Sequence, residues 1–158
     1  MIDATDQSAR AVAAAEGLGL AHTVTRHGPV RSLAEAAAAR GVEPAAVTKT
    51  IVVRLSESDY RFVLVPGDRE ISWPKLRALL GVNRVSMPNA DKALEVTGYV
   101  PGTISPLGST ISWPVIADSR VTGEVSIGGG APGVALSVDA ADLVGVLHAT
   151  VADITEPG

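Results

Sequence analysis

The sequence contains no cysteine and few aromatic residues, and both absences restrict what the protein can be. Without cysteine in its 158 residues, the chain has no disulfide, no thiolate nucleophile and no cysteine zinc site. Aromatic residues make up 3% of the chain and hydrophobic residues 46%, so we expect a core of alanine, valine, isoleucine and leucine. The first residues, Met1–Arg10, are polar, so we expect no leader segment, and no apolar run is long enough to span a bilayer. We therefore expect a cytoplasmic protein without membrane contact.

The motifs of several common enzyme classes are also missing. There is no Gly-x-Ser-x-Gly nucleophile elbow. The segment Val47-Thr-Lys-Thr50 ends like a nucleotide-binding P-loop but lacks the glycines that precede the lysine in that loop. The histidines, His22, His27 and His148, fit no His-Glu-x-x-His pattern. We therefore expect no metal and no cofactor, and a nucleotide hydrolase or transferase is a remote alternative.

The positive charge is concentrated in one part of the chain. The formal net charge is −4, which argues against a generally basic nucleic-acid binder. The segment from Arg26 to Lys92 nevertheless holds 11 basic and seven acidic residues, whereas the chain after Arg120 holds no basic and five acidic residues. Two interpretations remain open for the basic segment: an ordinary solvated surface, or a face that contacts phosphate.

Glycine and proline, in contrast, are plentiful, and they separate short periodic segments. The 16 glycines and ten prolines predict many sharp turns and a sheet-rich fold. We expect a single α+β domain over residues 1–158, with a mixed, mostly antiparallel sheet surrounded by short helices. Helices are predicted at 8–16, 33–40, 73–80, 90–96 and 140–147, from capping residues and glycine stops. Strands are predicted at 20–26, 49–54, 60–65, 84–86, 115–117, 121–127, 134–138 and 149–154.

Three features are candidates for a functional site. The first is the segment Thr97–Gly108, in which three glycines and two prolines allow a backbone to approach a ligand and present N–H groups to it. The second is Lys49, a cation at the start of an apolar strand. The third is the turn Gly128–Gly133. The alternatives are a surface connection, a charged residue that protects a sheet edge, and a plain hairpin turn. Together, the three features suit an acyl or phosphate ligand held by backbone donors and one charge.

These three motifs resemble those of the YbaK/EbsC-like aminoacyl-tRNA deacylases, which are free-standing relatives of the prolyl-tRNA synthetase editing domain. The matching segments are Val47–Val53, Thr97–Gly108 and Ile127–Gly133, and they occur in the order and at the spacing of that family. The helix start at Asp139 and the segment Val151–Ile154 also match. The resemblance covers about residues 22–154.

The resemblance implies a fold and a site. The fold is a mixed, partly barrel-like sheet with helices around it, and the pocket takes a small aminoacyl group on the 3′ end of tRNA. Lys49 matches the lysine most closely tied to activity, so it is the expected catalytic residue. The expected substrate-binding residues are Thr50, Gly98, Tyr99, Pro101, Gly102, Thr103, Ser105, Pro106, Gly108, Gly128, Gly129 and Gly130. Hydrolysis in the family needs no metal, and the ribose hydroxyl of the substrate is thought to assist.

The sequence departs from the members of the family that remove cysteine. Thr25 and Arg26 stand near the place of a tyrosine, Gly128 replaces a serine, and Thr103 stands where many members carry a glycine. We therefore expect a hydrolase that removes alanine or cysteine from proline tRNA, with alanine as the first choice. The alternative is a non-catalytic module of the same fold that binds an aminoacyl group, a tRNA end or a protein partner. A prolyl-tRNA synthetase is a possible partner, and a monomer is the default expectation.

Overall fold

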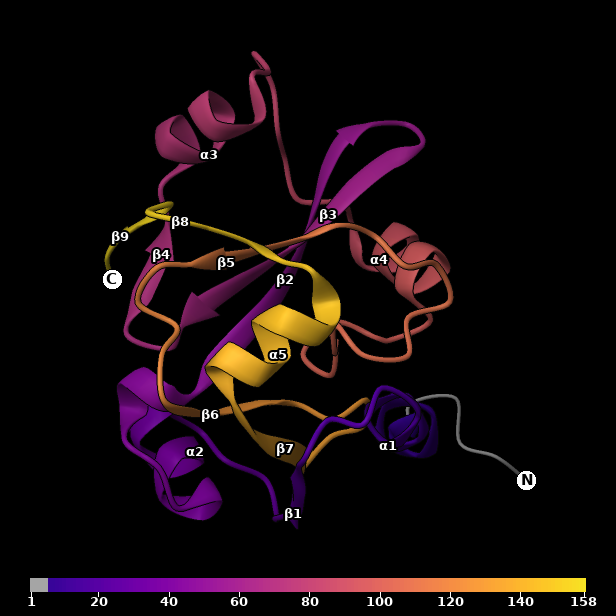
Figure 1. Ribbon diagram of the computed structural model, residues 1–158, viewed down its shortest axis with the longest axis vertical. Helices are drawn as coiled ribbons and strands as arrows, with labels where there is room; N and C mark the ends of the chain where they lie inside the picture. Colours follow the sequence, from indigo (N-terminus) through magenta and orange to yellow (C-terminus); the bar gives the residue numbers. More distant parts are fainter. Residues whose placement is uncertain (1–5) are drawn as a thin grey trace.

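The computed structural model describes residues 6–158, in which short helices surround three small sheets (Figure 1). The α helices are α1 (Ser8–Gly17), α2 (Leu33–Arg40), α3 (Trp73–Leu80), α4 (Ala90–Thr97) and α5 (Ala140–Leu147), and a 3₁₀ turn, η1, spans Pro44–Ala46. The strands are β1 (Thr23–Arg26), β2 (Thr48–Ser56), β3 (Asp59–Pro66), β4 (Arg69–Ile71), β5 (Val115–Asp118), β6 (Glu124–Gly128), β7 (Val134–Asp139), β8 (Thr150–Ala152) and β9 (Thr155–Pro157). No helix within these residues is both long enough and apolar enough to cross a membrane.

The largest sheet has the strand order β2-β3-β5-β8, in which β2 forms one edge. Its first pair is antiparallel and the other two are parallel. A second sheet, β1-β7-β6, and the two-stranded sheet β4-β9 are antiparallel throughout. A parallel bridge between Val47 and Ser126 joins the edge of the largest sheet to β6. The predicted α+β class, with a mixed and mostly antiparallel sheet, is confirmed.

Local capping signals determine most helix ends. The side chains of Ser32, Ser72, Asn89 and Asp139 each accept a backbone N–H three residues further along the chain, as expected of N-caps. Gly41, Gly81 and Gly98 then end three of these helices in the left-handed conformation, which costs glycine little. The helix predictions were therefore accurate to within a residue or so.

The core lies on both faces of the largest sheet. On one face, β2, β3 and β5 pack against β6, β7, α1, α4 and α5 through aliphatic side chains and the buried rings of Tyr60, Phe62 and Tyr99. On the other face, Val53, Val63 and Ile116 pack against Leu76 of α3 and Ile154. The predicted aliphatic core is confirmed, and it includes three of the five aromatic residues, whereas Trp73 and Trp113 are partly exposed at its margin.

Several strand predictions were wrong in extent. The first strand begins at Thr23 rather than Leu20, and residues 84–86 contribute a single bridge, from Ser86 to Arg54, instead of a strand. The strand predicted from Val121 begins at Glu124, because Gly123 turns the chain with a φ of 68°. The last predicted strand ends at Ala152, since the N–H of Ile154 donates to the carboxylate of Asp118 instead of a neighbouring strand. Strands β4 and β9 were not predicted.

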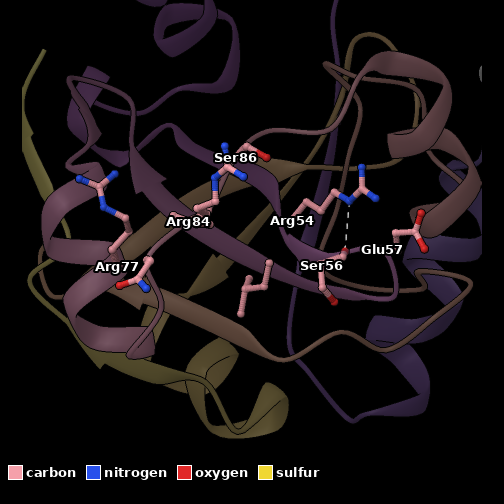
Figure 2. A pocket seen from close by; sticks show the side chains of 9 residues that line it. Arg54, Ser56, Glu57, Arg77, Arg84 and Ser86 are labelled. Carbon is pink, nitrogen blue, oxygen red and sulfur yellow. Dashed lines mark hydrogen bonds between the residues drawn. The ribbon is translucent and has the colours of Figure 1, made fainter.

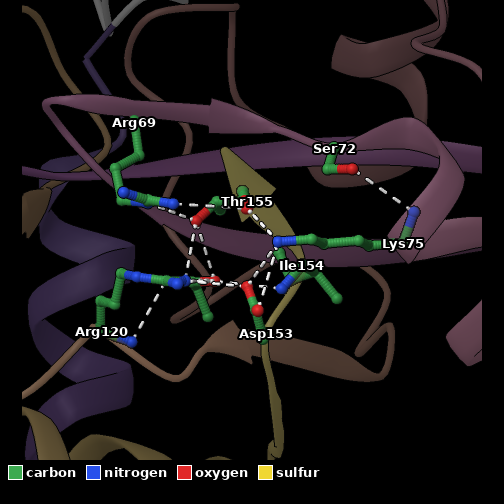
Figure 3. Close-up of polar contacts among 8 residues, drawn as sticks. Arg69, Ser72, Lys75, Arg120, Asp153, Ile154 and Thr155 are labelled. Atoms are coloured by element: carbon green, nitrogen blue, oxygen red, sulfur yellow. Dashed lines mark hydrogen bonds and ion pairs between the residues drawn. The ribbon is translucent and has the colours of Figure 1, made fainter. Parts of the chain in front are cut away.

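Strand β9 is attached through a cluster of polar side chains around Asp118 (Figure 3). The fully buried Asp118 carboxylate accepts hydrogen bonds from the Thr155 hydroxyl at 3.0 Å and from Ile154 N–H at 3.1 Å. Arg69 of β4 donates from Nε to the Thr155 hydroxyl at 2.7 Å. We call these residues, together with Arg120, Lys75 and Asp153, the C-terminal clip; it fixes β4 beside β9.

Candidate functional site

A cavity of about 150 Å³ lies where β2 begins, between α2, β6 and the glycine-rich loop. Strand β2 is an edge strand of the largest sheet, and the residues at its start form the largest group of lining residues. The lining residues are Arg40, Val47, Thr48, Lys49, Thr50, Gly102, Ile104 and Gly128. Four residues predicted from the sequence, Lys49, Thr50, Gly102 and Gly128, are therefore brought together, from segments far apart in the chain.

Lys49 is held in place by the backbone of β4. Its Nζ donates to the carbonyl oxygen of Arg69 at 2.6 Å, and the side chain is half-buried. An ammonium group has three N–H donors, so this bond orients the group and leaves others for a ligand. Since the Arg69 side chain is bonded to Thr155, the C-terminal clip fixes the carbonyl that positions Lys49.

Arg40, which was not predicted as a site residue, is the second cation at the cavity. It ends α2 and reaches across to β6, where Nη1 donates to the Ser126 hydroxyl at 3.5 Å. Burial lowers the pKa of the Arg40 guanidinium from its ordinary value. No carboxylate within residues 6–158 forms an ion pair with it. The only sequence signal for Arg40 was its membership of the basic segment, which does not distinguish it from ten other basic residues.

Two polar atoms of the cavity residues are buried without a hydrogen-bond partner. They are Nε of Arg40 and the hydroxyl oxygen of Thr50. Buried polar groups are bonded in the great majority of cases, so each exception needs a reason. Both atoms belong to side chains that line one small cavity, which is the arrangement expected where a ligand supplies the missing partners.

Gly128 allows the glycine-rich loop to approach β6. A Cβ at this position would lie 2.6 Å from the carbonyl oxygen of Ile104, a backbone atom that cannot easily move. Gly102, in contrast, has a φ of 89°, and a Cβ there would meet no atom within 4 Å. Gly128 therefore closes one wall of the cavity, whereas Gly102 borders open space.

Tyr99 lies in the core beneath the glycine-rich loop, away from the cavity wall. It is fully buried, and its hydroxyl donates to the carbonyl oxygen of Leu107 at 2.6 Å. Burial raises its pKa, and the guanidinium of Arg10, 4.6 Å above the ring centroid, opposes that rise. The hydrogen bond between Tyr99 and Leu107 therefore joins the beginning of the Thr97–Gly108 loop to its end.

Several predicted N–H donors of the glycine loops are already bonded within the protein. Gly129 donates to Val134, Gly130 donates to Thr103, and Thr103 donates to Val100, at 2.9–3.0 Å. The hydroxyl of Thr103 also donates to Val100, at 2.8 Å. The bond from Gly130 to Thr103 joins the Gly128–Gly133 turn to the loop, the bond from Gly129 closes the turn, and the bond from Thr103 lies within the loop, so none of these three N–H groups is available to a ligand in this conformation.

The remaining predicted residues also lie outside the cavity lining. Gly98 is the C-cap of α4, and its carbonyl accepts a hydrogen bond from Arg10. The hydroxyl of Ser105 accepts the N–H of Leu107, and Pro101 is exposed. Pro106 and Gly108 line a separate, largely apolar cavity with Trp113 and Leu147. Within residues 6–158, no three His, Cys, Asp or Glu side chains are grouped as metal ligands would be.

A second basic cavity, of about 470 Å³, lies at the other end of β2 (Figure 2). Arg54, Arg77 and Arg84 line it together with one acidic residue, Glu57. A double hydrogen bond between the backbones of Arg54 and Ser86 draws the segment after α3 against the strand. None of the three guanidinium groups forms an ion pair with a residue of the range 6–158. We call this cavity the arginine groove; it is part of the basic segment seen in the sequence.

The fold and the cavity define a class of α+β protein with a small site that is lined by two cations and two glycines. A site of this size and charge suits a small acyl group. Comparison with known families places the chain more narrowly. The sequence profile of the family described as "Aminoacyl-tRNA editing domain" matches residues 27–146. The chain belongs to this family, as the motifs around Lys49, Gly102 and Gly128 predicted.

Among curated proteins, proline–tRNA ligases match. The ligase of Trichlorobacter lovleyi is 33% identical over 91 residues, and that of Bacillus licheniformis is 31% identical over 104 residues. These alignments cover 58% and 65% of this chain but only 16% and 18% of the ligases. The chain therefore corresponds to less than a fifth of the length of these relatives.

Solved structures match over nearly the whole chain. A hypothetical protein, APE2540, has a TM-score of 0.84 at 27% identity, with 93% of this chain and 99% of that chain covered. A protein provisionally described as a trans-editing enzyme for prolyl tRNA synthetase has a TM-score of 0.85 at 27% identity, with 96% and 98% covered. The similarity in fold therefore extends well beyond the segment that aligns with the ligases.

Proposed function

We propose that this protein is a trans-editing deacylase, which hydrolyses the ester between a wrongly attached small amino acid and tRNA. The observation that carries the proposal is that Lys49, Thr50, Gly102 and Gly128 line one cavity in a member of the aminoacyl-tRNA editing domain family. The substrate we propose first is alanine on proline tRNA, with cysteine as the second. The reaction proceeds by attack of water, without a metal.

Lys49 is the proposed catalytic residue. The ester carbonyl gains negative charge as water attacks it, and a positioned cation stabilises that charge more than it stabilises the uncharged ester. Lys49 lines the cavity, and its hydrogen bond to the Arg69 carbonyl fixes the position of the ammonium group. The carbon–oxygen bond to the ribose then breaks, and the ribose oxygen takes up the proton released by the attacking water.

The size of the cavity supports a small aminoacyl group. Its volume of about 150 Å³ is well below the roughly 300–1,000 Å³ of pockets that hold drug-sized ligands. The terminal nucleotide must then lie outside the cavity, and only the acyl group enters. Because a small apolar pocket discriminates by about 1–3 kcal/mol per methylene, we expect modest rather than absolute discrimination between alanine and its close homologues.

The proposal is tested by a panel of tRNAs, each charged with a different amino acid. We expect rapid deacylation of alanyl-tRNA(Pro), and a loss of at least about 10²-fold in kcat for Lys49→Ala and Lys49→Met, as for other groups that stabilise an oxyanion. Lys92→Ala is the matched control, because Lys92 is paired with Glu95 on the exposed face of α4 at 2.9 Å. Circular dichroism and thermal unfolding show whether each variant is folded.

Two outcomes would contradict the proposal. Full activity in Lys49→Ala would remove Lys49 from the mechanism. Binding of charged tRNA without hydrolysis, for every amino acid in the panel, would instead favour the non-catalytic binding module.

A further inference from the structure

We infer that Arg40 is a second catalytic cation, whose guanidinium stabilises the negatively charged oxygen that forms on the ester carbonyl. The inference rests on the proposed deacylase function and concerns the same cavity. It adds a side chain of α2 to the backbone N–H groups of the glycine loops, to which the sequence assigned this role.

The distribution of donors around the cavity is the first argument. Of the backbone N–H groups expected to donate, that of Gly98 is already bonded to Leu94 at 2.8 Å, and those of Thr103, Gly129 and Gly130 are bonded to other backbone carbonyls. The N–H of Gly102, which lines the cavity, has no acceptor within residues 6–158, so it is the backbone donor that remains there. Arg40 also lines the cavity, with a buried Nε that has no partner. Its one hydrogen bond to a side chain, to the Ser126 hydroxyl, is long at 3.5 Å. A donor that is already positioned but not yet bonded is what stabilisation of a developing charge requires.

The charge of the cavity is the second argument. Two of its lining residues, Arg40 and Lys49, are cations, and none is an acid. Burial of Arg40 penalises its charge, and no carboxylate within residues 6–158 compensates for it. A buried charge without a counter-ion is costly unless a ligand completes it. An anion is therefore the ligand chemistry that this site favours.

The size of the cavity identifies which anion is bound. A volume of about 150 Å³ admits an acyl group but not a nucleotide with its phosphate. The anion inside the cavity is therefore the one that the reaction itself creates. The oxygen of water adds to the carbonyl carbon, and the former carbonyl oxygen becomes the oxyanion beside Arg40 and Lys49. Its collapse restores the carbonyl and breaks the bond to the ribose oxygen, which leaves as a hydroxyl after taking the proton of the water.

The test compares Arg40→Ala, Arg40→Lys and the control Arg31→Ala in steady-state deacylation of alanyl-tRNA(Pro). Arg31 is exposed in the segment before α2 and does not line the cavity. We expect Arg40→Ala to lower kcat by about 10²–10³-fold, with KM changed less than threefold. We expect Arg40→Lys to be intermediate, because it keeps the charge but not the planar fork of donors. Guanidinium ion added to Arg40→Ala should partly restore kcat. The same addition should not raise the kcat of the wild type or of Arg31→Ala.

A structural role for Arg40 would give a different pattern. Arg40 is half-buried and has no counter-ion within residues 6–158, so we expect the thermal midpoint of Arg40→Ala to be unchanged or raised. A fall in midpoint that accounts for the lost activity would overturn the inference. A rise in KM with kcat unchanged would also overturn it, because it would mean that Arg40 binds a phosphate of the tRNA. The activity of the wild-type protein tests the proposed function separately. If the wild type does not deacylate alanyl-tRNA(Pro), both proposals fail. If the wild type is active and Arg40→Ala is equally active, only the inference about Arg40 is refuted.

Discussion

At the scale of single residues, the cavity depends on positions where a side chain is absent as much as on those where one is present. Gly128 has no room for a Cβ, because the carbonyl of Ile104 lies 2.6 Å from where it would be. Gly102 has room, but its φ of 89° strains any other residue. The two glycines are therefore required for different reasons, close approach of the backbone at Gly128 and backbone conformation at Gly102.

Replacing Gly102 by valine tests whether the loop forms a wall of the substrate site. A β-branched residue at this φ should cost about 1–3 kcal/mol of folding stability, and its side chain should reduce kcat/KM for deacylation by obstructing the cavity. Gly123→Val is the matched control, because Gly123 has a φ of 68° and open space around its Cβ position but does not line the cavity. Urea unfolding and deacylation are measured for both variants. If Gly102→Val keeps its activity and is merely less stable, the loop has only a structural role.

At the scale of secondary-structure elements, the position of Lys49 depends on the last strand of the chain. Strand β9 pairs with β4, and the carbonyl of Arg69 in β4 accepts the hydrogen bond of Lys49. The C-terminal clip fastens this pair through hydrogen bonds of Thr155 to Asp118 and to Arg69, and Figure 3 shows Arg69 beside Thr155. Residues 147–158 lie outside the segment that the family profile matches, yet β9, one of the two strands within them, supports the proposed catalytic residue.

The ion pairs of the C-terminal clip predict a dependence of stability on pH. Hydrogen bonds from Arg120 and then Lys75 lower the pKa of Asp153 from its ordinary value of 3.8 to about 2. A carboxylate with a lowered pKa in the folded protein stabilises it at pH values above about 4, and that contribution is lost as the pH falls towards 2. We expect Asp153→Asn to lower the urea midpoint at pH 7 and to match the wild type increasingly closely between pH 4 and pH 2.

The control for this prediction is Asp68→Asn, which removes an exposed carboxylate that has no ion pair within residues 6–158. Its effect on the midpoint should be small at every pH. A constant difference between Asp153→Asn and the wild type from pH 7 to pH 2 would contradict the proposed contribution of the ion pairs. Because the groups are exposed, we expect the effect to be modest and to weaken as salt is added.

At the scale of the whole molecule, strand β2 connects two cationic sites. The small cavity lies at its start, around Lys49, and the arginine groove lies near its end, around Arg54. The two residues are five positions apart on one strand, which corresponds to about 17 Å. Strand β2, which is the edge strand of the largest sheet (Figure 1), thus holds the small cavity and the arginine groove at a fixed separation.

This arrangement predicts that the arginine groove binds phosphates of the tRNA near its charged end. Arg54→Gln, Arg77→Gln and Arg84→Gln should each weaken tRNA binding, and each should reduce the slope of log K against log salt concentration by about 1 for every phosphate that the variant no longer neutralises. We expect kcat at saturating tRNA to be nearly unchanged. Arg26→Gln is the control, because Arg26 is exposed on β1 and does not line the groove. Salt slopes equal to that of the wild type in all three groove variants would show that the surface is merely solvated.

The sequence determined most of the elements and predicted four of the residues that line the small cavity. Capping residues, glycine stops and short periodic runs act within a few residues, so the helices and the long strands could be predicted from them. The motifs around Lys49, Gly102 and Gly128 were recognisable for the same reason, and they indicated the family that the comparison later confirmed. Strands β4 and β9 could not be predicted, because three-residue strands carry almost no pattern and each depends on a partner 84–88 residues away.

The tertiary structure decided which charged residues act together. Arg40 reaches Ser126, and Arg69 reaches Thr155, across 86 positions of sequence in both cases. Nothing local to Arg40 distinguishes it from the other basic residues between Arg26 and Lys92. Its burial, its unbonded Nε and its place beside Lys49 arise only when α2 packs against the junction of β2 and β6. Local sequence therefore specified the backbone segments that line the cavity. Long-range packing placed Arg40 there as the second cation, because the burial of a side chain and its distance from carboxylates are properties of the folded chain.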